Sequence, residues 1–239
     1  AKKPIAIFQH TEVGAPGTVP SILEALGLPS RIVDGEPVPP RAGDFSGLVF
    51  MGGYMSVHDP LPWIAQELAL VRQAAELRIP VAGHCLGSQL VAAGLGASVR
   101  KNARPEIGWN PITADRSPQA EEWFGRPAGT PILTFQWHGD TFELPRGAER
   151  IATSLHCENQ AFVMEGRHLA MQCHFEMTPE LVELSVSRNG AQLDREYAAG
   201  NPAVTSREQT LSDPPAHTAD MRKSLERLYS RWAIGVRSA

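Results

Sequence analysis

The sequence has few cysteines, no long apolar run and no long run of charge of one sign. Its three cysteines, at positions 85, 157 and 173, cannot form a disulfide framework, so we expect a reducing, cytoplasmic setting. Because no run reaches about 18 apolar residues, we expect no membrane span, and the N-terminal apolar part is too short for a signal peptide. The net charge of −4 argues against a nucleic-acid-binding surface.

Apolar segments in the N-terminal part of the chain alternate between strand-like and helix-like patterns. Residues 47–51 are nearly all apolar, as in a strand covered on both faces, whereas 63–77 has apolar residues at helical spacing. We therefore expect an α/β fold with a central, mostly parallel sheet and helices on both faces. The remaining strands expected here are 5–8, 31–34 and 79–82, and the remaining helices are 19–26 and 88–93.

The second half of the chain predicts a smaller antiparallel portion, because short strands there are separated by turn signals. A length of 239 residues suits one domain over 1–239, with a core of about 1–190. Residues 198–218, rich in Pro, Ser, Thr and Ala, predict a loop-rich insert, and 219–234 predicts an amphipathic C-terminal helix. The short strands are expected at 107–112, 131–136, 149–154, 161–164 and 169–173.

The most informative segment is Gly83-His84-Cys85-Leu86-Gly87, which lies between an expected strand and an expected helix. It is the cysteine version of the G-x-S-x-G nucleophile elbow. Glycines on both sides permit a tight turn with a strained residue at its apex. The helix dipole and the free N–H groups at the start of the helix favour a thiolate there. Cys85 is therefore the candidate nucleophile.

A candidate base and its partner lie at the end of a later strand. His174 and Glu176 are two residues apart, so on an extended chain they face the same side. A carboxylate beside a histidine fixes its tautomer and stabilises its charged form. Cys85, His174 and Glu176 thus make a plausible nucleophile, base and orienting group.

These motifs resemble those of class I (triad) glutamine amidotransferase domains, which carry G-x-C-x-G and, later, Q-x-H-x-E. Both patterns are present, at Gly83–Gly87 and Gln172–Glu176, and the glycine pair Gly52–Gly53 after an earlier strand is a third match. The resemblance covers roughly residues 44–180. It implies a flavodoxin-like sheet and hydrolysis of a γ-glutamyl amide through a Cys85 thioester, with neither a metal nor an organic cofactor.

The resemblance also implies roles for residues around the nucleophile. The N–H groups of Gly53 and Leu86 would form an oxyanion hole, as acyl transfer requires. Gln89, one helical turn after Cys85, would contact the bound glutamine, although its position alone equally suits a solvent-facing helix residue. Gly139 and Asp140, in a family-like loop, would hold the α-amino and α-carboxylate groups.

Two other histidines could compete for the role of the base. His138 and Asp140 form a rival His-x-Asp pair, but the setting of His174 at a strand end matches both the geometry and the family position. His84 adjoins the nucleophile in the sequence, and its side chain is expected to point away from Cys85.

A zinc site is a further possibility raised by the pairs His156–Cys157 and Cys173–His174. Neighbours on a strand point to opposite faces, so neither pair easily supplies two ligands, and we expect no metal. Cys157 and Cys173 lie on expected strands without a helix N-terminus beneath them, so Cys85 should be the most reactive thiol.

The substrate and the partner are less defined by the sequence. Tyr54, Trp137, Cys173 and Phe175 differ from common family residues and are expected to flank the pocket, where they could pack against a leaving group larger than ammonia. The chain has no P-loop motif and no room for a synthetase domain. Either a separate synthetase subunit takes the ammonia, or the protein hydrolyses γ-glutamyl peptides or conjugates. A non-catalytic binding or regulatory module is a third alternative.

Overall fold

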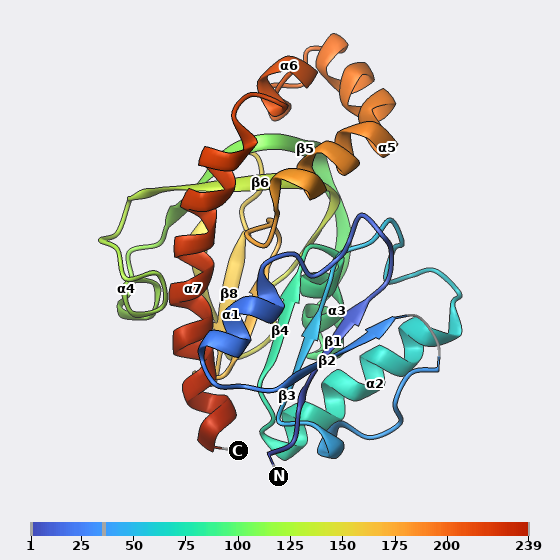
Figure 1. Cartoon of the computed structure of the whole chain (residues 1–239), viewed down its shortest axis with the longest axis vertical. Helices are drawn as coiled ribbons and strands as arrows, with labels where there is room; N and C mark the ends of the chain where they lie inside the picture. The colour runs from blue at the N-terminus through green and yellow to red at the C-terminus, as the bar shows by residue number, and fades with distance from the viewer. Residues whose placement is uncertain (1, 35–36, 239) are drawn as a thin grey trace.

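The structure, a computed structural model, describes residues 2–34 and 37–238 (Figure 1). The predicted single unit over 1–239 also includes Ala1, Gly35–Glu36 and Ala239, which lie outside the described residues. Over the two described ranges, nine strands form one mixed sheet in the order β2-β1-β3-β4-β9-β8-β7-β5-β6. The expected α/β fold is confirmed.

The sheet has a parallel half and an antiparallel half. Strands β2, β1, β3, β4 and β9 pair in parallel, and β9, β8, β7, β5 and β6 pair antiparallel. The strands are β1 Ile5–Gln9, β2 Ser30–Asp34, β3 Gly47–Phe50, β4 Val81–His84, β5 Val99–Ala114, β6 Pro131–Phe142, β7 Ala148–Thr153, β8 Ala161–Met164 and β9 His168–Met171.

Helices cover both faces of the sheet because alternate residues of each strand point to opposite sides. Ile5 and Ile7 of β1 pack in one cluster with α1 and α7, whereas Ala6 and Phe8 pack in another with α2 and α3. The helices are α1 Val19–Ala25, the 3-10 helix η1 Ala42–Asp44, α2 Pro62–Leu77, α3 Leu86–Gly94, α4 Pro118–Phe124, α5 Pro179–Ala198, α6 Arg207–Thr210 and α7 Pro214–Ser238.

The C-terminal region differs from the sequence prediction. The expected loop over 198–218 contains α6 and the start of α7, which runs from Pro214 to Ser238 instead of 219–234. Pro214 can begin a helix because a first-turn residue needs no N–H donor. The sequence analysis placed Thr218 in the loop. In the structure its hydroxyl donates a hydrogen bond to the Pro214 carbonyl at 2.8 Å, within α7.

Helices α4 and α5 were not predicted, and both carry recognisable start signals. Ser117 and Thr178 are their N-caps, and each accepts a hydrogen bond from the N–H three residues later. A proline follows each cap, which suits the first helical position. Figure 1 shows α5 and α6 at one end of the molecule and the two chain ends at the other. Over the described ranges, no helix combines the length and apolar character needed to cross a membrane.

Candidate active site

The candidate site lies where three neighbouring parallel strands end. Gly52–Gly53 follows β3, Cys85 follows β4 and His174 follows β9, and these strands are adjacent in the sheet. The carboxyl ends of parallel strands meet at one edge, where ligand sites of open α/β sheets cluster. β9 ends at Met171, earlier than the predicted strand 169–173. A β-bridge to Phe135 of β6, with N–O distances of 2.8 and 3.2 Å, then fixes the His174 backbone.

Cys85 occupies a strained elbow. Its φ is +53° and its ψ is −113°, a conformation that L-residues adopt only when their surroundings impose it. The Cys85 N–H donates to the Met171 carbonyl at 2.9 Å, which ties the apex to β9. A Cβ at Gly87 would overlap the Phe50 carbonyl, and one at Gly83 would overlap the Gly87 carbonyl. Both glycines are therefore required by close backbone contacts.

The His174 side chain is paired with a buried carboxylate. His174 Nδ1 lies 2.6 Å from Glu176 Oε1, and Glu176 is only 1% exposed. Cys85 and His174 both lie next to Gly52, since a Cβ there would meet Cys85 Cβ at 3.5 Å and His174 Cε1 at 3.2 Å. Nδ1 donates to Glu176, which leaves Nε2 as the ring nitrogen that can serve Cys85.

The three groups stabilise the charged form of the imidazole. Burial alone would lower the pKa of His174, but the charge of Glu176, together with the charge and hydrogen bond of Cys85, raises it well above its usual value. Burial alone would raise the pKa of Glu176, and the charge and hydrogen bond of His174 lower it overall. The pair is therefore held as imidazolium and carboxylate.

His84 does not face the nucleophile but lies behind Glu176. Its Nε2 is 2.7 Å from the Tyr229 hydroxyl of α7, and its Nδ1 is 3.9 Å from Glu176 Oε2, too far for a hydrogen bond. Burial lowers the pKa of His84 to about 4, against the raising effect of Glu176. A neutral ring thus packs beside the carboxylate, and the expectation that His84 points away from Cys85 agrees with these contacts.

A cavity of about 240 Å³ opens on one side of Cys85. It contains the residues that the family resemblance assigns to the substrate, which are Gly53, Leu86, Gln89, Gly139 and Asp140. Leu86 is the first residue of α3, so its N–H has no acceptor within the helix. A Cβ on Gly53 would meet Leu86 Cδ2 at 3.1 Å, which places the two residues that carry the candidate oxyanion donors next to each other.

Gln89 is buried instead of facing solvent, as its position alone had equally allowed. Its Nε2 donates to Gln172 Oε1 at 3.2 Å and lies 3.4 Å from the Asp140 carbonyl. Gln89 therefore links α3 to the Gly139–Asp140 turn and to the Gln172 that precedes the candidate base.

A second cavity, of about 60 Å³, also borders Cys85. His174 lines it together with Phe135, Met177 and Ser185, whereas Gln89, Gly139 and Asp140 line only the larger cavity. The two cavities share five residues: Gly53, Tyr54, Cys85, Trp137 and Asn189. Cys85 thus borders both a larger polar space and a smaller space that His174 lines.

The rival base His138 has both ring nitrogens engaged. Its Nε2 lies 2.7 Å from Glu106 Oε1 and its Nδ1 lies 2.7 Å from the backbone carbonyl of Asp140, not from the Asp140 carboxylate. The geometry therefore favours His174 as the base, because its ring lies next to Gly52 beside Cys85 and only its Nδ1 is engaged by a carboxylate. Glu106, which the sequence did not single out as functional, holds His138 and through it the Asp140 turn.

Cys157 lies beside this second histidine, in a group with Glu106 and His138 whose candidate ligand atoms lie within 4.8 Å of one another. Both Glu106 oxygens accept hydrogen bonds, from His138, Gln160 and Ser154. Burial raises the pKa of Cys157 to about 12, partly offset by its hydrogen bond with Thr141. These groups form a buried hydrogen-bonded network with a protonated thiol.

Only two of the four unusual residues flank the cavities. Tyr54 and Trp137 line both. Cys173 and Phe175 are fully buried in the core cluster that contains α1 and α7, so the expectation that they flank the pocket is wrong. They alternate with His174 along an extended segment, and alternate side chains point to the opposite side.

Helix α5 supplies site residues that the sequence analysis missed. Asn189 lines both cavities and Gln192 lines the larger one. Asn189 Nδ2 donates to the Tyr54 hydroxyl at 3.3 Å, and Trp137 Nε1 donates to Gln192 Oε1 at 2.9 Å. The capping signal Thr178-Pro179 could have revealed the helix, but no sequence motif marks its contacts.

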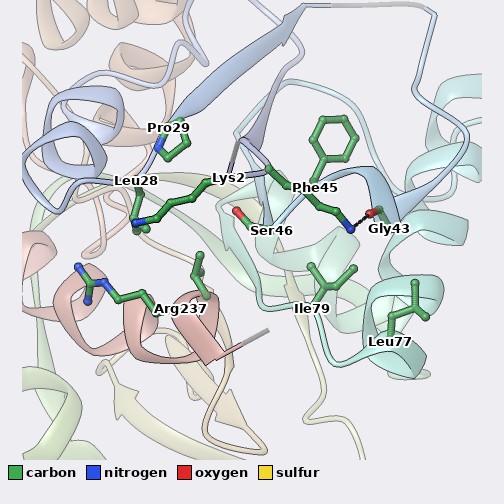
Figure 2. Close-up of a pocket in the computed structure, with 11 residues that line it drawn as sticks. Lys2, Leu28, Pro29, Gly43, Phe45, Ser46, Leu77, Ile79 and Arg237 are labelled. Atoms are coloured by element: carbon green, nitrogen blue, oxygen red, sulfur yellow. Dashed lines mark hydrogen bonds between the residues drawn. The ribbon is translucent and has the colours of Figure 1, made fainter.

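A larger cavity, of about 630 Å³, lies away from this site (Figure 2). Lys3, Leu28, Phe45 and Ile79 line it, and each precedes a strand of the parallel half. It therefore lies at the amino edge of these strands, opposite Cys85. Its lining includes no cysteine, histidine or carboxylate among the described residues, so it offers none of the groups on which the candidate chemistry depends.

The fold and the cysteine elbow define the class of protein, and comparison with known proteins agrees. The family model for glutamine amidotransferase class-I matches residues 22–192. This chain therefore belongs to the class I glutamine amidotransferase family.

Individual relatives carry related names. The chain is 34% identical over 169 residues to the glutamine amidotransferase-like protein YfeJ of Salmonella typhimurium, covering 69% of this chain and 70% of that protein. It is 29% identical over 180 residues to a subunit of the glutamine-hydrolyzing GMP synthase of Natronomonas pharaonis, covering 75% and 89%. A crystal structure of a glutamine amidotransferase from Methylobacillus flagellatus superposes with a TM-score of 0.93 at 37% identity, covering 98% and 96%.

Proposed function

We propose that the protein hydrolyses the γ-carboxamide of glutamine, or of a small γ-glutamyl amide, through a thioester on Cys85. The observation that carries this proposal is the buried His174–Glu176 pair, 2.6 Å apart, beside a cysteine held in the left-handed region of an elbow. A nucleophile, a base and a group that orients the base are the parts that covalent acyl transfer needs.

In the first half-reaction, the Cys85 thiolate attacks the γ-carbonyl carbon. The N–H groups of Gly53 and Leu86 stabilise the tetrahedral oxyanion. The His174 imidazolium gives its proton to the leaving nitrogen, the C–N bond breaks and ammonia departs. Glu176 holds His174 in the correct tautomer and offsets its charge, without taking the proton itself.

In the second half-reaction, neutral His174 removes a proton from water. The resulting hydroxide attacks the thioester carbonyl, the C–S bond breaks and glutamate leaves with the restored thiolate and imidazolium. The α-amino and α-carboxylate groups would lie in the 240 Å³ cavity with Gln89, Gly139 and Asp140. Neither half-reaction needs a metal or an organic cofactor.

The test is release of glutamate and ammonia from glutamine by the purified chain. Wild-type protein should form both products in equal amounts, whereas Cys85→Ala should form neither. Acid quenching during turnover should trap a glutamyl adduct on the Cys85 peptide, seen by mass spectrometry. Wild-type protein that cleaves no γ-glutamyl amide, alone or with a partner, would refute the proposal.

Ammonia transfer to a partner is a second candidate, favoured by one observation. The relative from Natronomonas pharaonis is a subunit of GMP synthase, and its name describes a protein that works with another chain. For the present protein, a separate synthetase subunit would bind over the carboxyl edge of the parallel strands. Glutamine hydrolysis that stays low in the isolated chain and rises when a cell extract is added would support such a partner.

A further inference from the structure

We infer that Asn189 and Gln192 of α5 determine substrate specificity, because they fasten Tyr54 and Trp137 into a wall that limits the leaving group to ammonia or a small amine. This inference rests on the proposed function. Helix α5 lies outside the three sequence motifs. The substrates among which this wall would discriminate all carry a γ-glutamyl group.

The two cavities can be assigned to the two ends of the substrate. The leaving nitrogen must lie beside its proton donor, so it occupies the 60 Å³ cavity that His174 lines. The γ-glutamyl part then occupies the 240 Å³ cavity, which contains Gln89 and Asp140 but not His174. Since one water needs roughly 10–15 Å³ on this measure, the smaller cavity holds roughly four to six water-sized groups. Ammonia or methylamine fits with space to spare, whereas a leaving group as large as glycine would fill the cavity.

What keeps the smaller cavity small is a set of side chains from three separate segments. Tyr54 comes from the loop after β3, Trp137 from β6 and Asn189 from α5, and all three line both cavities. The Phe135 ring contacts both Trp137 and His174. Its centroid lies 6.2 Å from the Trp137 ring centroid and 6.3 Å from the His174 ring centroid. Growth of the leaving group beyond an amine would therefore require these side chains to move.

Helix α5 holds the two aromatic side chains by one hydrogen bond each. Asn189 and Gln192 are three residues apart and so lie on one face of the helix. The bonds join Asn189 Nδ2 to the Tyr54 hydroxyl and Trp137 Nε1 to Gln192 Oε1. Tyr54 is 61% exposed, so little packing restrains its ring once the bond to Asn189 is lost.

The helix itself is also fixed by apolar contacts. Val186 and Leu193 are buried in a cluster with Ile107 of β5 and Val204, against which Trp137 also packs. Removing Asn189 or Gln192 should therefore leave α5 in place while releasing the Tyr54 ring and loosening Trp137. This separation makes the wall testable without unfolding the helix.

The experiment compares kcat/KM for glutamine, γ-glutamylmethylamide and γ-glutamylglycine in four variants. These are Asn189→Ala, Gln192→Ala, Tyr54→Phe and the Asn189→Ala/Gln192→Ala double variant. Tyr54→Phe keeps the ring and removes only its hydrogen bond with Asn189. It therefore separates the effect of the hydrogen bond from the effect of ring size. The matched control is Arg188→Ala, which breaks an exposed ion pair of α5 with Glu12 and lines neither cavity.

We expect the ratio of γ-glutamylglycine to glutamine to rise about two- to tenfold in each single variant, the range that one net hydrogen bond represents. It should rise further in the double variant. The kcat/KM for glutamine should change by a smaller factor than that for γ-glutamylglycine, and Arg188→Ala should match wild type. Combining Tyr54→Phe with Asn189→Ala should add little to either alone, because both remove the same bond.

Unchanged ratios in all four variants, with glutamine turnover intact, would overturn the inference and leave the proposed function standing. A wild-type preference for γ-glutamylglycine over glutamine would also overturn it. A fall in the turnover of all three substrates by the same factor would mean that α5 only supports the fold. If wild-type protein cleaves none of them and Cys85→Ala behaves identically, the proposed function fails and the inference fails with it.

Discussion

Three hydrogen-bonded histidine–glutamate pairs are buried among the described residues, and besides His10–Glu67 two of them have nearly the same nitrogen–oxygen distance in different surroundings. His174 and Glu176 lie 2.6 Å apart at the end of β9, and His138 and Glu106 lie 2.7 Å apart across β5 and β6. In the first pair Nδ1 is engaged by Glu176 and the ring lies near the Cys85 side chain. In the second, both nitrogens are taken by the Glu106 carboxylate and the Asp140 carbonyl. A short His–Glu distance is therefore not enough to identify a base.

The different surroundings of the two His–Glu pairs indicate that the two halves of the sheet contribute differently to the site. The parallel half brings the candidate reacting groups together at the ends of adjacent strands. The antiparallel half holds the turn at Gly139–Asp140 by a network of buried polar groups. The first pair should therefore govern the rate of the chemical step, and the second should govern how well substrate is held.

The largest effect should come from Cys85→Ala. Removing the nucleophile removes the thioester route, so kcat should fall by at least about three orders of magnitude. Steady-state glutamate release measures the fall, and the urea-unfolding midpoint tests whether the fold is retained. Residual turnover near the wild-type rate would remove Cys85 from the mechanism. Among the three thiols, an electrophilic glutamine analogue should label Cys85 first, and excess glutamine should slow that labelling.

His174→Ala should come next and should nearly equal Cys85→Ala, with the double variant little worse, because groups that act as a unit are strongly non-additive. Glu176→Gln should lose about one to two orders of magnitude less, since it orients the base without accepting its proton. A kinetic double-mutant cycle measures this coupling. Additive losses would show that Cys85 and His174 do not act together.

The second pair should give a smaller and different effect. Glu106→Gln weakens the hold on His138 and on the Asp140 turn, so KM should rise about three- to tenfold while kcat changes by less than about threefold, as expected for loss of roughly one net hydrogen bond. Saturation kinetics with glutamine separates the two constants. A fall in kcat as large as that of His174→Ala would reverse the assignment of the two histidines.

The smallest effect concerns stability and a third buried histidine. Burial, with the nearby charge of Arg167, lowers the pKa of His168 to about 4, whereas its unfolded value is near 6.5. Between these values the unfolded chain binds the extra proton, so the free energy of unfolding falls as pH falls. From pH 7 to pH 5 this group should cost about 2 kcal/mol.

His168→Asn tests this pH dependence. The asparagine oxygen can replace Nδ1, which accepts the Val81 N–H at 3.2 Å, but the side chain does not titrate. Urea unfolding at pH 7 and pH 5 should show a difference about 2 kcal/mol smaller for the variant than for wild type. His84, whose pKa is also lowered to about 4, keeps its own contribution and serves as the internal reference. An unchanged difference would contradict the assignment of this titration to His168.

The sequence could predict that Cys85, His174 and Glu176 lie together at strand ends because their local patterns are specific. A glycine on each side of Cys85, or two polar residues at one strand end, follows from short-range sterics and from the two-residue period of a strand. The contacts of His84 and Glu106 could not be predicted. Their partners, Tyr229 and His138, are 145 and 32 residues away in the chain, and no motif records such a pairing.

The walls of the site were missed for the same reason. Asn189 and Gln192 are ordinary polar residues on a helix. Their proposed role depends on hydrogen bonds with Tyr54 and Trp137, which lie far away in the sequence. Cys173 and Phe175 illustrate the opposite error, because proximity to His174 in the sequence suggested the pocket while alternation along the strand directs them into the core. The loop predicted over 198–218 was misjudged from its proline content, although Pro214 begins α7.

Tyr229 lies far along the chain from the elbow that it supports, so the order of synthesis matters. It lies in α7 and contacts His84, the residue just before the nucleophile, while Trp232 of the same helix donates to the Val81 carbonyl of β4 at 3.1 Å. During synthesis, β4 and the elbow leave the ribosome long before these two aromatic residues. The growing chain therefore carries its cysteine through much of translation without the helix that packs behind it. The contacts that α7 makes with β4 and with His84 form only once α7 has been made.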